Sequence, residues 1–308
     1  MIINIATILT VHNRKQLTLD CLRHLFAASH SYNTQYDGNR TIKLTVFLTD
    51  DGCTDDTANA VRETFPHHDI KILQGTGSLY WAGGMRFAWQ AAIDEGTQWD
   101  YFLLLNDDTN MMANAFNELF EADEYEYQHW GKRGICSGIT CKPKQPDTIT
   151  YGGLNFVNKT RGRQVRIVPI GHPQPIDLVH ANILLIHHSV TKEIGIFHQG
   201  YIHACADNDY SMMAKRHHFP VFSTSHVCGE CDDDHATKEG ETKDLFNMTL
   251  NERKAFIHSP IHSDKDYLLF VRRNMPLRYP ISIVVRCIRL YFPKLYYQIS
   301  KSRGIYKK

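Results

Sequence analysis

Short apolar and β-branched runs alternate with stretches of helical spacing through the first third of the chain. The runs predict strands at residues 3–11, 44–48, 70–73 and 101–105, and the stretches predict helices at residues 17–28, 55–65, 84–95 and 113–122. Repeated strand–helix units indicate a mostly parallel sheet that helices cover on both faces. We therefore expect an α/β fold.

The remainder of the chain is less regular. Its apolar patterns predict strands at residues 148–156, 160–168, 177–187 and 221–226, and a helix after Asp207. Residues 228–243 are rich in Asp, His, Gly and Lys and show no periodicity, so we expect a mobile loop there. The pattern fits one continuous domain followed by a C-terminal appendage.

Polar clusters follow every predicted strand of the first third, at residues 10–14, 50–56, 75–86 and 106–109. In open α/β sheets, ligands bind outside the carboxyl ends of the strands, where such loops converge. One of the clusters places Asp107 and Asp108 side by side directly after a buried strand. Adjacent carboxylates repel each other and are costly to desolvate, so this pair is either a solvated loop or a site with a compensating cation.

The overall composition is that of an ordinary globular protein, with 308 residues, 43% apolar and 22% charged. The formal net charge of +1 argues against a dedicated nucleic-acid binder. The charge is distributed unevenly, however. The segment from Lys265 onward contains eleven Lys and Arg residues but only one acid, Asp266. This segment therefore has a net charge of about +10, and the preceding residues have a net charge of about −9. Such a basic segment suggests a partner with an anionic surface.

The lengths of the apolar runs and the distribution of the cysteines bear on the cellular location. Every run is shorter than the ~18–20 residues that a membrane-spanning helix needs, and no basic residues precede the first one, so we expect neither a spanning helix nor a secretory signal. The 8 scattered cysteines are then expected to be reduced thiols in a cytoplasm. Cys228 and Cys231 have zinc-like spacing, but without a second pair the signal is weak.

Four segments, TVHNRKQL, TDDGCTDDT, LLLNDDT and ADNDYSMMAKRHHFPVF, resemble in order and spacing the motifs of the family 2 glycosyltransferases. A fifth, GSLYWAGGMRFAW, resembles a loop of a bacterial, rhamnosyltransferase-like branch of that family. The resemblance covers about residues 4–226 and, more weakly, the tail through Arg273 and Asn274. It implies the GT-A fold of the nucleotide-diphospho-sugar transferases, a Rossmann-like and mostly parallel central sheet flanked by helices, with a divalent cation, Mn²⁺ or Mg²⁺, as cofactor.

The resemblance places the donor nucleotide sugar against the strand-end clusters. The residues implied are Thr10, Asn13, Arg14, Asp50, Asp51, Trp81, Gly83, Gly84, Arg86 and Asp107. Glycines ahead of a helix can present backbone N–H groups to an anion, and an arginine can form a bidentate pair of hydrogen bonds with a phosphate. Structural roles remain the alternative, with Asn13 as a helix N-cap, Asp51 in a turn and Trp81 in the core.

The family holds its cation at this strand end with a D-x-D motif, and Asn106-Asp107-Asp108 stands at that place. Oxygen ligands completed by phosphates suit Mg²⁺ or Mn²⁺. Because Asn106 replaces the first acid, Asp108 is the metal ligand that the resemblance implies. His226 matches the position of a further ligand in many relatives, and a structural histidine is the alternative.

The segment Ala206–Asp209 resembles the Glu-Asp motif that precedes a helix, where the family's Asp takes a proton from the acceptor hydroxyl. A carboxylate at a helix N-terminus is stabilised as the anion and is available as a base. The resemblance implies Asp207 as the base and Asp209 as the second candidate, with helix capping as the alternative role. Ala206 replaces the usual Glu, which leaves the acceptor contacts open.

These features predict an inverting, metal-dependent glycosyltransferase that moves a sugar from a UDP-, dTDP- or GDP-sugar to a saccharide or lipid-linked acceptor in cell-surface polysaccharide synthesis. Inversion follows from the resemblance and from one base without an evident covalent nucleophile. A non-catalytic nucleotide-sugar or glycan-binding module is the alternative, favoured by Asn106 and Ala206. A nucleotidyltransferase would need a basic Gly-rich signature near the N-terminus, which we do not find.

We expect a glycosyltransferase domain at residues 1–264, with a nucleotide-sugar-binding half (1–110) and an acceptor half (111–264), and a basic helical tail at residues 265–308. The tail mixes Tyr and Phe with basic residues around an apolar ISIVV. That mixture suits an interfacial helix on anionic lipid, at the inner face of the cell membrane. A solvated basic helix packed on the catalytic domain is the alternative. Three prolines exclude a single long helix.

Overall fold

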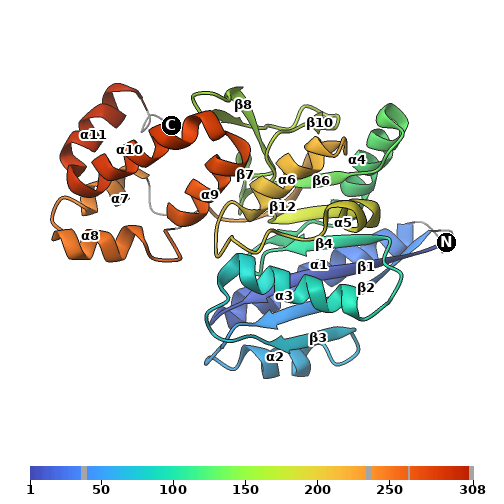
Figure 1. The fold of residues 1–308 in the computed structure, drawn as a ribbon. Coiled ribbons are helices and arrows are strands. Elements are labelled where there is room, and N and C mark those ends of the chain that lie inside the picture. Colours follow the sequence, from blue (N-terminus) through green and yellow to red (C-terminus); the bar gives the residue numbers. More distant parts are fainter. Residues whose placement is uncertain (36–39, 234–237, 263, 305–308) are drawn as a thin grey trace.

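The computed structural model describes residues 1–35, 40–233, 238–262 and 264–304. A central sheet runs through the molecule and helices cover both of its faces (Figure 1). Its strands are, in spatial order, β10 (Gln174–Pro175), β12 (Val221–Glu230), β6 (Ile135–Lys142), β11 (Ile183–His187), β4 (Tyr101–Leu105), β1 (Ile2–Val11), β2 (Thr41–Asp50) and β3 (Ile70–Gln74). The short strands β5 (Asn110–Met111) and β7 (Gln145–Tyr151) pair with β12 and β6, and β8 (Leu154–Asn158) and β9 (Arg163–Arg166) form a separate hairpin. The predicted α/β class is confirmed.

The first four long strands are parallel, as predicted: β2 lies between β1 and β3, and β4 lies on the other side of β1. All residues of β4 are buried, and so is β1 from Ala6 to Val11. Strands buried on both faces read as continuous apolar runs, which is the pattern in the sequence. Because the four strands point the same way, the loops that follow them meet at one side of the sheet, here named the carboxyl edge.

Strand β11 brings a distant part of the chain to the same edge. It is antiparallel to both neighbours, and Ile183 at its start pairs with Leu105 at the end of β4. Strand β12 is parallel to β6 and ends at Glu230, which pairs with Asn110 of β5. The residues just before β11 and just after β12 therefore reach the carboxyl edge.

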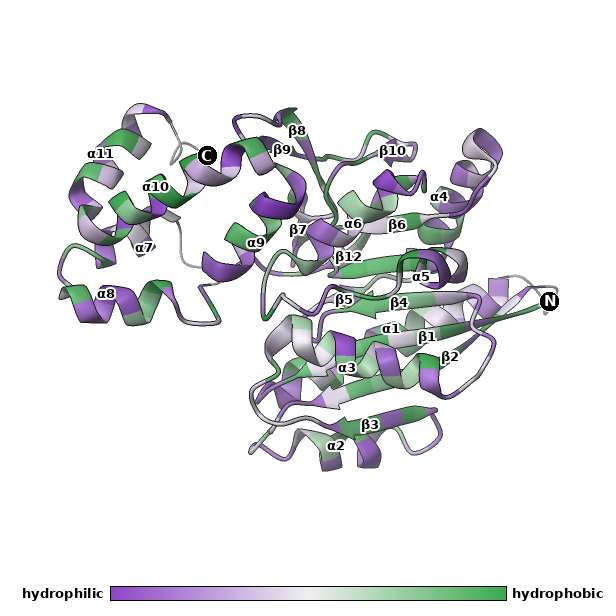
Figure 2. Cartoon of the chain, viewed as in Figure 1, coloured by the Kyte–Doolittle hydropathy of each residue, from purple (hydrophilic) through white to green (hydrophobic). Residues whose placement is uncertain are grey.

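Two apolar cores fill the space between the sheet and its helices. One face packs α1 (Lys15–Gln35), α2 (Thr57–Thr64) and α4 (Ala115–Trp130), and the other packs α3 (Tyr80–Asp94), α5 (His188–Ile194) and α6 (Ala206–Arg216). Trp89 on α3 is fully buried among aromatic rings of the second core. Figure 2 shows apolar residues concentrated on the central strands and hydrophilic residues on the outward sides of the helices.

The described residues after β12 are largely helical. They form α7 (Lys238–Asp244), α8 (Leu250–Ile257), α9 (Asp264–Asn274), the 3₁₀ turn η1 (Pro276–Arg278), α10 (Tyr279–Tyr291) and α11 (Pro293–Ser302). Helix α9 packs on α6, whereas α10 and α11 pack on α8 and α7 around Leu245, Ile257 and Leu290. We expected the helical tail to begin after residue 264. The helices of this group lie on both sides of that boundary, with α7 and α8 before it and α9, α10 and α11 after it. The expected breaks are confirmed, since Pro276, Pro280 and Pro293 stand in the first turns of η1, α10 and α11.

No helix in the described ranges combines the length and the apolar character that crossing a bilayer would require.

The predicted elements differ from the observed ones in several places. The expected strand 148–156 is divided between β7 and β8, and only residues 163–166 of the expected strand 160–168 form β9. Only residues 183–187 of the expected strand 177–187 form β11, because Leu178 bridges to Leu154 instead. Part of the expected loop 228–243 is regular, since β12 continues to Glu230 and α7 begins at Lys238; residues 234–237 lie outside the described ranges. Helix α3 begins at Tyr80, so the glycines expected ahead of the helix lie inside its first turns.

The second of these glycines, Gly84, has a packing reason. A Cβ at Gly84 would lie 2.7 Å from Cβ of Thr10 on β1, closer than such atoms approach, so α3 can sit on the sheet only with a glycine there. At Gly83 the nearest atom would be Cβ of Leu79, at 3.3 Å.

We expect Gly84→Ala to lower the free energy of unfolding by roughly 1–3 kcal/mol, because overpacking forces the helix off the strand. Gly83→Ala is the matched control in the same helix turn. It should be neutral or stabilising, since alanine is favoured over glycine inside a helix by about 1 kcal/mol. Urea unfolding of both variants measures the difference; equal effects would contradict the close approach of α3 and β1.

Candidate active site

Arg14 supplies the positive charge that the paired carboxylates need. Its guanidinium forms two ion pairs, from Nη1 to Oδ1 of Asp107 at 2.9 Å and from Nη2 to Oδ2 of Asp108 at 3.0 Å. Arg14 follows β1 and the acids follow β4, and these strands are neighbours in the sheet. The sequence predicted the three residues at one edge, but the direct fork between them is a finding of the structure. The three side chains together keep one net negative charge when both acids are ionised.

Asp107 is the more buried of the two acids, with 5% of its surface exposed. Burial raises its pKa to about 7; the negative charge of Asp108 acts in the same direction, and Arg14 opposes both. Among the described residues its Oδ2 atom is buried and has no hydrogen-bond partner. Such an atom is costly to leave unpaired, so it is an open position for a cation or a donor group.

Asn106, which stands where the family motif has an acid, holds Trp81. The indole Nε1–H of Trp81 donates to Oδ1 of Asn106 over 2.8 Å, and the ring lies against Phe197, with centroids 5.6 Å apart. Trp81 is half-buried, between a core position and a surface position. The amide therefore anchors an aromatic side chain directly beside the acid pair.

Asp51 organises the loop between β3 and α3. Its two carboxylate oxygens accept the backbone N–H groups of Gly77, Leu79 and Tyr80 at 2.8, 2.9 and 3.0 Å. A Cβ at Gly75 would lie 2.8 Å from the same carboxylate. Because both carboxylate oxygens already accept backbone N–H groups, the role of Asp51 is to fix the conformation of the loop that faces the site.

The predicted N-cap role of Asn13 is filled by Asp55, whose Oδ2 accepts the N–H of Lys15 at the start of α1. Asn13 instead lies in the left-handed region, with φ of 53°, and its Oδ1 accepts the N–H of Thr54 at 2.7 Å. Asp50 is buried and accepts the N–H of Cys53 at 2.7 Å. The loops after β1 and β2 are thus tied together.

Arg86 forms hydrogen bonds within the protein. Its guanidinium donates to the backbone carbonyls of His198 and Tyr201, at 3.1 and 2.7 Å, on the loop that precedes α6. Burial lowers its pKa, and Asp266 partly offsets this effect. Arg86 therefore holds the loop ahead of α6 in place from helix α3, whose Gly84 contacts the sheet.

The irregular segment 179–182 connects the acid pair to Asp207. On one side, the carbonyl of Asn182 accepts the N–H of Asn106, and its side-chain amide donates to Thr109. On the other side, the N–H of Ala181 donates to Oδ2 of Asp207 at 3.2 Å. Since consecutive Cα atoms are ~3.8 Å apart, Asp207 and the acid loop are brought to the same place at the carboxyl edge. Sequence reasoning missed Asn182, which had been placed inside a strand.

Asp207 has the properties of a proton acceptor. It stands in the first turn of α6, and burial raises its pKa, while hydrogen bonds from the N–H groups of Asn208 and Ala181 pull in the opposite direction. A carboxylate with a raised pKa binds a proton more readily near neutral pH. This is the chemistry expected of a base.

Asp209 is committed to helix α9. Its carboxylate is buried and accepts from Nε of Arg273 at 3.1 Å and from Nδ2 of Asn274 at 2.6 Å. On the same helix, Asp266 accepts the N–H groups of residues 202, 203 and 204, at distances of 2.7 to 3.2 Å. Helix α9, which was expected to belong to the tail, therefore holds both α6 and the loop before it.

His226 is turned toward α4. Its Nδ1 lies 2.9 Å from Oε1 of Glu118, and its backbone N–H donates to the other oxygen of that carboxylate. The side chain beside Asp108 is instead Cys231, whose Sγ lies 3.7 Å from Oδ1 of Asp108. Burial and the charge of Asp108 raise the pKa of this thiol to about 12. Its position follows from β12 running on to Glu230, which the sequence pattern did not show.

One trio of ligand-type side chains lies close enough to share an ion, among the residues that can be described: Asp123, Glu126 and Cys136. It lies away from the carboxyl edge, beside Tyr101 at the start of β4. Arg133 already forms an ion pair with Asp123, and burial raises the pKa of Glu126 well above its ordinary value. This trio therefore already has a cationic partner of its own in Arg133.

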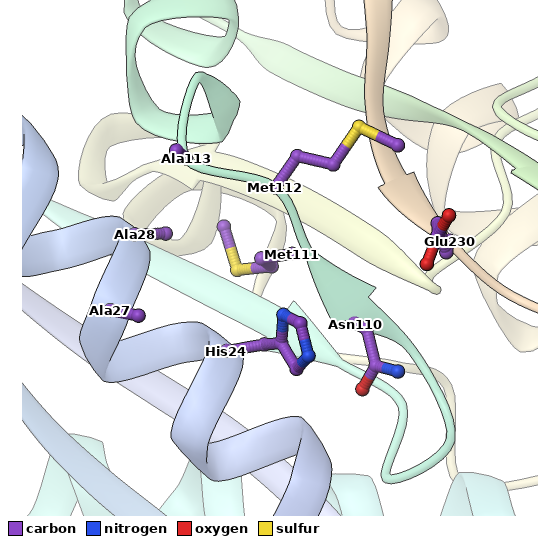
Figure 3. A pocket seen from close by; sticks show the side chains of 8 residues that line it. All are labelled: His24, Ala27, Ala28, Asn110, Met111, Met112, Ala113 and Glu230. Carbon is purple, nitrogen blue, oxygen red and sulfur yellow. The ribbon is translucent and has the colours of Figure 1, made fainter. Parts of the chain in front are cut away.

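A hollow of about 360 Å³ lies behind the acid loop, between α1 and β5 (Figure 3). In that view His24 points from α1 toward Asn110, and Glu230 stands on the far side. Two methionines and three alanines supply most of the remaining lining. The hollow borders the site but contains neither Asp107 nor Asp108.

The structure is similar to crystal structures of TarS from S. aureus. For TarS 1-349 the TM-score is 0.52 at 13% identity, and the match covers 99% of this chain and 93% of that chain. For the same protein in complex with UDP the TM-score is 0.50, again at 13% identity and with the same coverage. No family model and no curated protein matches the sequence. At this identity the likeness shows the fold, and the expected GT-A class is confirmed.

The three hydrogen bonds of Asp266 can be tested directly. Asp266→Asn puts an amide NH₂ group where backbone N–H groups need an acceptor, and an unpaired buried donor costs roughly 1–3 kcal/mol. We expect a loss of about 2 kcal/mol in urea unfolding and faster amide hydrogen exchange at residues 202–204. The exposed neighbour provides the control, since Lys265→Gln should change stability by less than about 0.5 kcal/mol. Unchanged exchange in Asp266→Asn would show that α9 does not hold this loop.

Proposed function

We propose that this chain is an inverting, metal-dependent glycosyltransferase of the hexosyltransferase type. It moves a sugar from a nucleotide-sugar donor to a saccharide or lipid-linked acceptor in cell-surface polysaccharide synthesis. The observation that carries the proposal is the convergence of the acid pair and Asp207 on residues 179–182. The likeness of the fold to TarS in complex with UDP supports a nucleoside diphosphate sugar as donor.

The divalent cation, Mn²⁺ or Mg²⁺, would be held by Asp108 and Asp107. The fit rests on the net charge of −1 that remains beside Arg14 and on the unpaired buried oxygen of Asp107. Hard cations of this kind bind through one or two carboxylates and complete their shell with phosphate and water. When bound, the cation supplies positive charge to the donor's diphosphate. His226 is the weaker candidate ligand because its ring is bonded to Glu118.

The donor's nucleoside would lie over the loops that follow β1, β2 and β3. Thr10, Asn13, Arg14, Asp50 and Asp51 form this side of the site. Asn13 is exposed and Arg14 is partly exposed, so both can reach a ligand, whereas Asp50 and Asp51 act by shaping the loops.

The α3 loop contributes in the same two ways. Trp81 offers an aromatic edge beside Asn106, and Gly83 lies two residues further along the same helix. Gly84 fixes the position of α3 against β1, and Arg86 fixes the loop ahead of α6.

Asp207 would take the proton of the acceptor hydroxyl as that oxygen attacks the sugar carbon, and the nucleoside diphosphate leaves. A single base and a direct displacement give inversion at the sugar carbon. Asp209 is the less suitable base, because Arg273 neutralises its carboxylate. Its proposed role is to hold α6, and with it Asp207, against α9. The raised pKa of Asp207 favours proton transfer near neutral pH.

A non-catalytic nucleotide-sugar or glycan-binding module is the second candidate. Asn106 and Ala206 favour it, because each replaces an acid of the family motif. Both residues have structural roles here: Asn106 binds the indole of Trp81, and Ala206 is buried at the start of α6. The two candidates differ in turnover and not in donor binding.

Asp207→Asn keeps the size of the side chain and removes the proton acceptor. We expect donor affinity, measured by calorimetry with Mn²⁺ present, to stay near the parental value. Sugar transfer should fall by about 10²–10⁴-fold, the usual cost of losing a general base.

Asp108→Asn is the matched comparison and should weaken donor and metal binding together. Transfer by Asp207→Asn at the parental rate would overturn the base assignment. A parent protein that binds donors but transfers to no acceptor would favour the binding module.

The proposal includes attachment to an anionic membrane surface through α10 and α11. Helical spacing places Ile281, Val284 and Tyr291 on one side of α10. The exposed apolar residues of this region are Leu277, Ile281, Ile283, Val284, Tyr291, Phe292 and Leu295. Apolar side chains in such a stripe bind at a bilayer interface when basic residues flank them.

Most of the basic residues in the described part of the tail fall into two groups, and Arg278 donates to the carbonyl of Thr160. Arg273, Arg286 and Arg289 form ion pairs with Asp209, Asp264 and Glu241, so their charge is already balanced. The exposed ones are Lys265, Arg272, Lys294, Lys301 and Arg303. About half of the expected charge is therefore available to lipid headgroups, which makes the apolar stripe the larger contribution.

Replacing Ile281 and Val284 with serine should weaken binding to vesicles that contain phosphatidylglycerol by about tenfold or more, since each buried aliphatic side chain contributes about 1–3 kcal/mol. Serine at Val157 and Val168, which are equally exposed on the sheet domain, is the control and should leave binding unchanged. High salt should weaken the binding of the parent. Equal sedimentation of the Ile281/Val284 variant with vesicles would contradict the membrane proposal.

A further inference from the structure

The hairpin of β8 and β9 carries a positive charge that the surrounding body of the protein does not. The sequence contains no acid from residue 148 to residue 176. It contains four basic residues there, which lie in the turn or on β9 and are all exposed: Lys159, Arg161, Arg163 and Arg166. Because residues 1–264 together have a net charge of about −9, the hairpin is a local reversal of charge and indicates an anionic ligand.

Three of these charges are not neutralised within the protein. Among the described residues, the side chains of Lys159, Arg161 and Arg163 form no ion pair and no hydrogen bond. Arg166 differs, because its Nη1 donates to the carbonyl of Ile149 at 2.6 Å and lies 3.8 Å from Oδ2 of Asp233. The three free side chains are therefore available to a ligand, while Arg166 fixes the base of the hairpin.

A fifth basic side chain comes from the start of the tail. Figure 1 shows the hairpin beside the chain that follows α9, and there Nη1 of Arg278 donates to the carbonyl of Thr160 at 3.3 Å. The contact is close, since a Cβ at Gly162 would lie 2.8 Å from Cζ of Arg278. Among the described residues, the buried Nε of Arg278 has no hydrogen-bond partner. The turn of the hairpin is thus held against another cation instead of an acid.

The hairpin is joined at its base to the segment that contacts the proposed base. Leu154 of β8 bridges Leu178, and its N–H donates to the carbonyl of Leu178 at 2.9 Å. The carbonyl of the next residue, Val179, accepts from Nδ2 of Asn208, which neighbours Asp207 in the chain. A ligand on the hairpin would therefore lie next to the proposed site of proton transfer.

The hairpin also lies on the opposite side of the sheet from the loops proposed for the donor. The chain enters it from β7, which pairs with β6, and continues to β10 at one end of the sheet. Strands β1, β2 and β3, whose loops would hold the nucleoside, form the other end. The two sides can therefore hold two different ligands.

We propose that the β8–β9 hairpin binds an anionic saccharide chain, and that it selects acceptors that carry carboxylate or phosphate groups. The inference rests on the proposed function, which requires an acceptor beside Asp207.

The chemistry of the free side chains suits such an acceptor. Guanidinium groups form paired hydrogen bonds with carboxylate and phosphate oxygens, and Arg161 and Arg163 offer two of them within three residues. The exposed amide of Gln164 can bond to sugar hydroxyls. A lipid surface fits the hairpin less well, because the hairpin is fixed next to the proposed base, where an acceptor has to pass.

The test compares the parent with a variant in which Lys159, Arg161 and Arg163 are all replaced by glutamine. Calorimetry measures the binding of the full chain to polygalacturonate, which carries carboxylates, to phosphomannan, which carries phosphates, and to neutral dextran. The parent should bind at least one of the anionic chains and not dextran, and the variant should lose about tenfold or more in affinity. High salt should weaken the binding of the parent. Circular dichroism checks that the variant is folded.

Three basic residues elsewhere provide the matched control. Lys43, Lys132 and Lys192 are exposed and lie on β2, after α4 and on α5. Replacing them with glutamine removes the same charge away from the hairpin, so affinity for the anionic chain should change by less than about twofold. Both triple variants should keep the parental affinity for nucleoside diphosphate, measured with Mn²⁺ present.

The possible outcomes separate this inference from the proposed function. Equal losses in the two triple variants would overturn the inference, because net charge and not the hairpin would be responsible. It would also be overturned if the hairpin variant kept its affinity for the saccharides but lost binding to phosphatidylglycerol vesicles, since the hairpin would then be a lipid contact. If the parent binds UDP, dTDP or GDP but neither anionic chain, the inference fails and the proposed function stands. If the hairpin variant loses the anionic chain but the parent binds none of these nucleotides, the saccharide site stands and the proposed function fails.

Discussion

A carboxylate removed from water must find hydrogen-bond donors or a positive charge, and this requirement arranges the whole carboxyl edge. Asp51 finds three backbone N–H groups and so fixes the loop before α3; Asp266 finds three more and fixes the loop before α6. Asp107 and Asp209 each find an arginine from a distant part of the chain. Loops that carry little apolar packing are thereby held in place by hydrogen bonds and ion pairs.

The fold was predictable where the information is local. The continuous apolar runs of β1 and β4 and the helical spacing between them were sufficient for the parallel half of the sheet. The sequence did not show that β11 runs against its neighbours, since an apolar run carries no direction. It also did not show that Gly84 lies inside a helix, because the reason is the contact with Thr10, 74 positions away in the chain by number and adjacent only in space.

The sequence predicted which side chains meet at the carboxyl edge, but it did not predict their partners. Motifs singled out Asp107, Asp108 and Asp207, but a motif does not specify that Arg14 pairs with the acids or that residues 179–182 lie between them and Asp207. His226 on β12 shows the same limit: its sequence position matched that of a ligand in the family, but Glu118 on α4 decides where its ring points. Such choices depend on contacts between elements far apart in sequence, which periodicity cannot show.

The attachment of α9 to α6 has a consequence for how the protein is made. The loops that follow β1 to β4 have all been synthesised once the chain has passed Thr109, although Asn182 of a later segment also holds the acid loop. The residues that hold α6 and the loop before it, Asp266, Arg273 and Asn274, come much later. During synthesis, domains and subdomains fold as their residues emerge. The parallel half of the sheet can therefore begin to form more than 150 residues of translation before α6 and the loop ahead of it gain their contacts with α9.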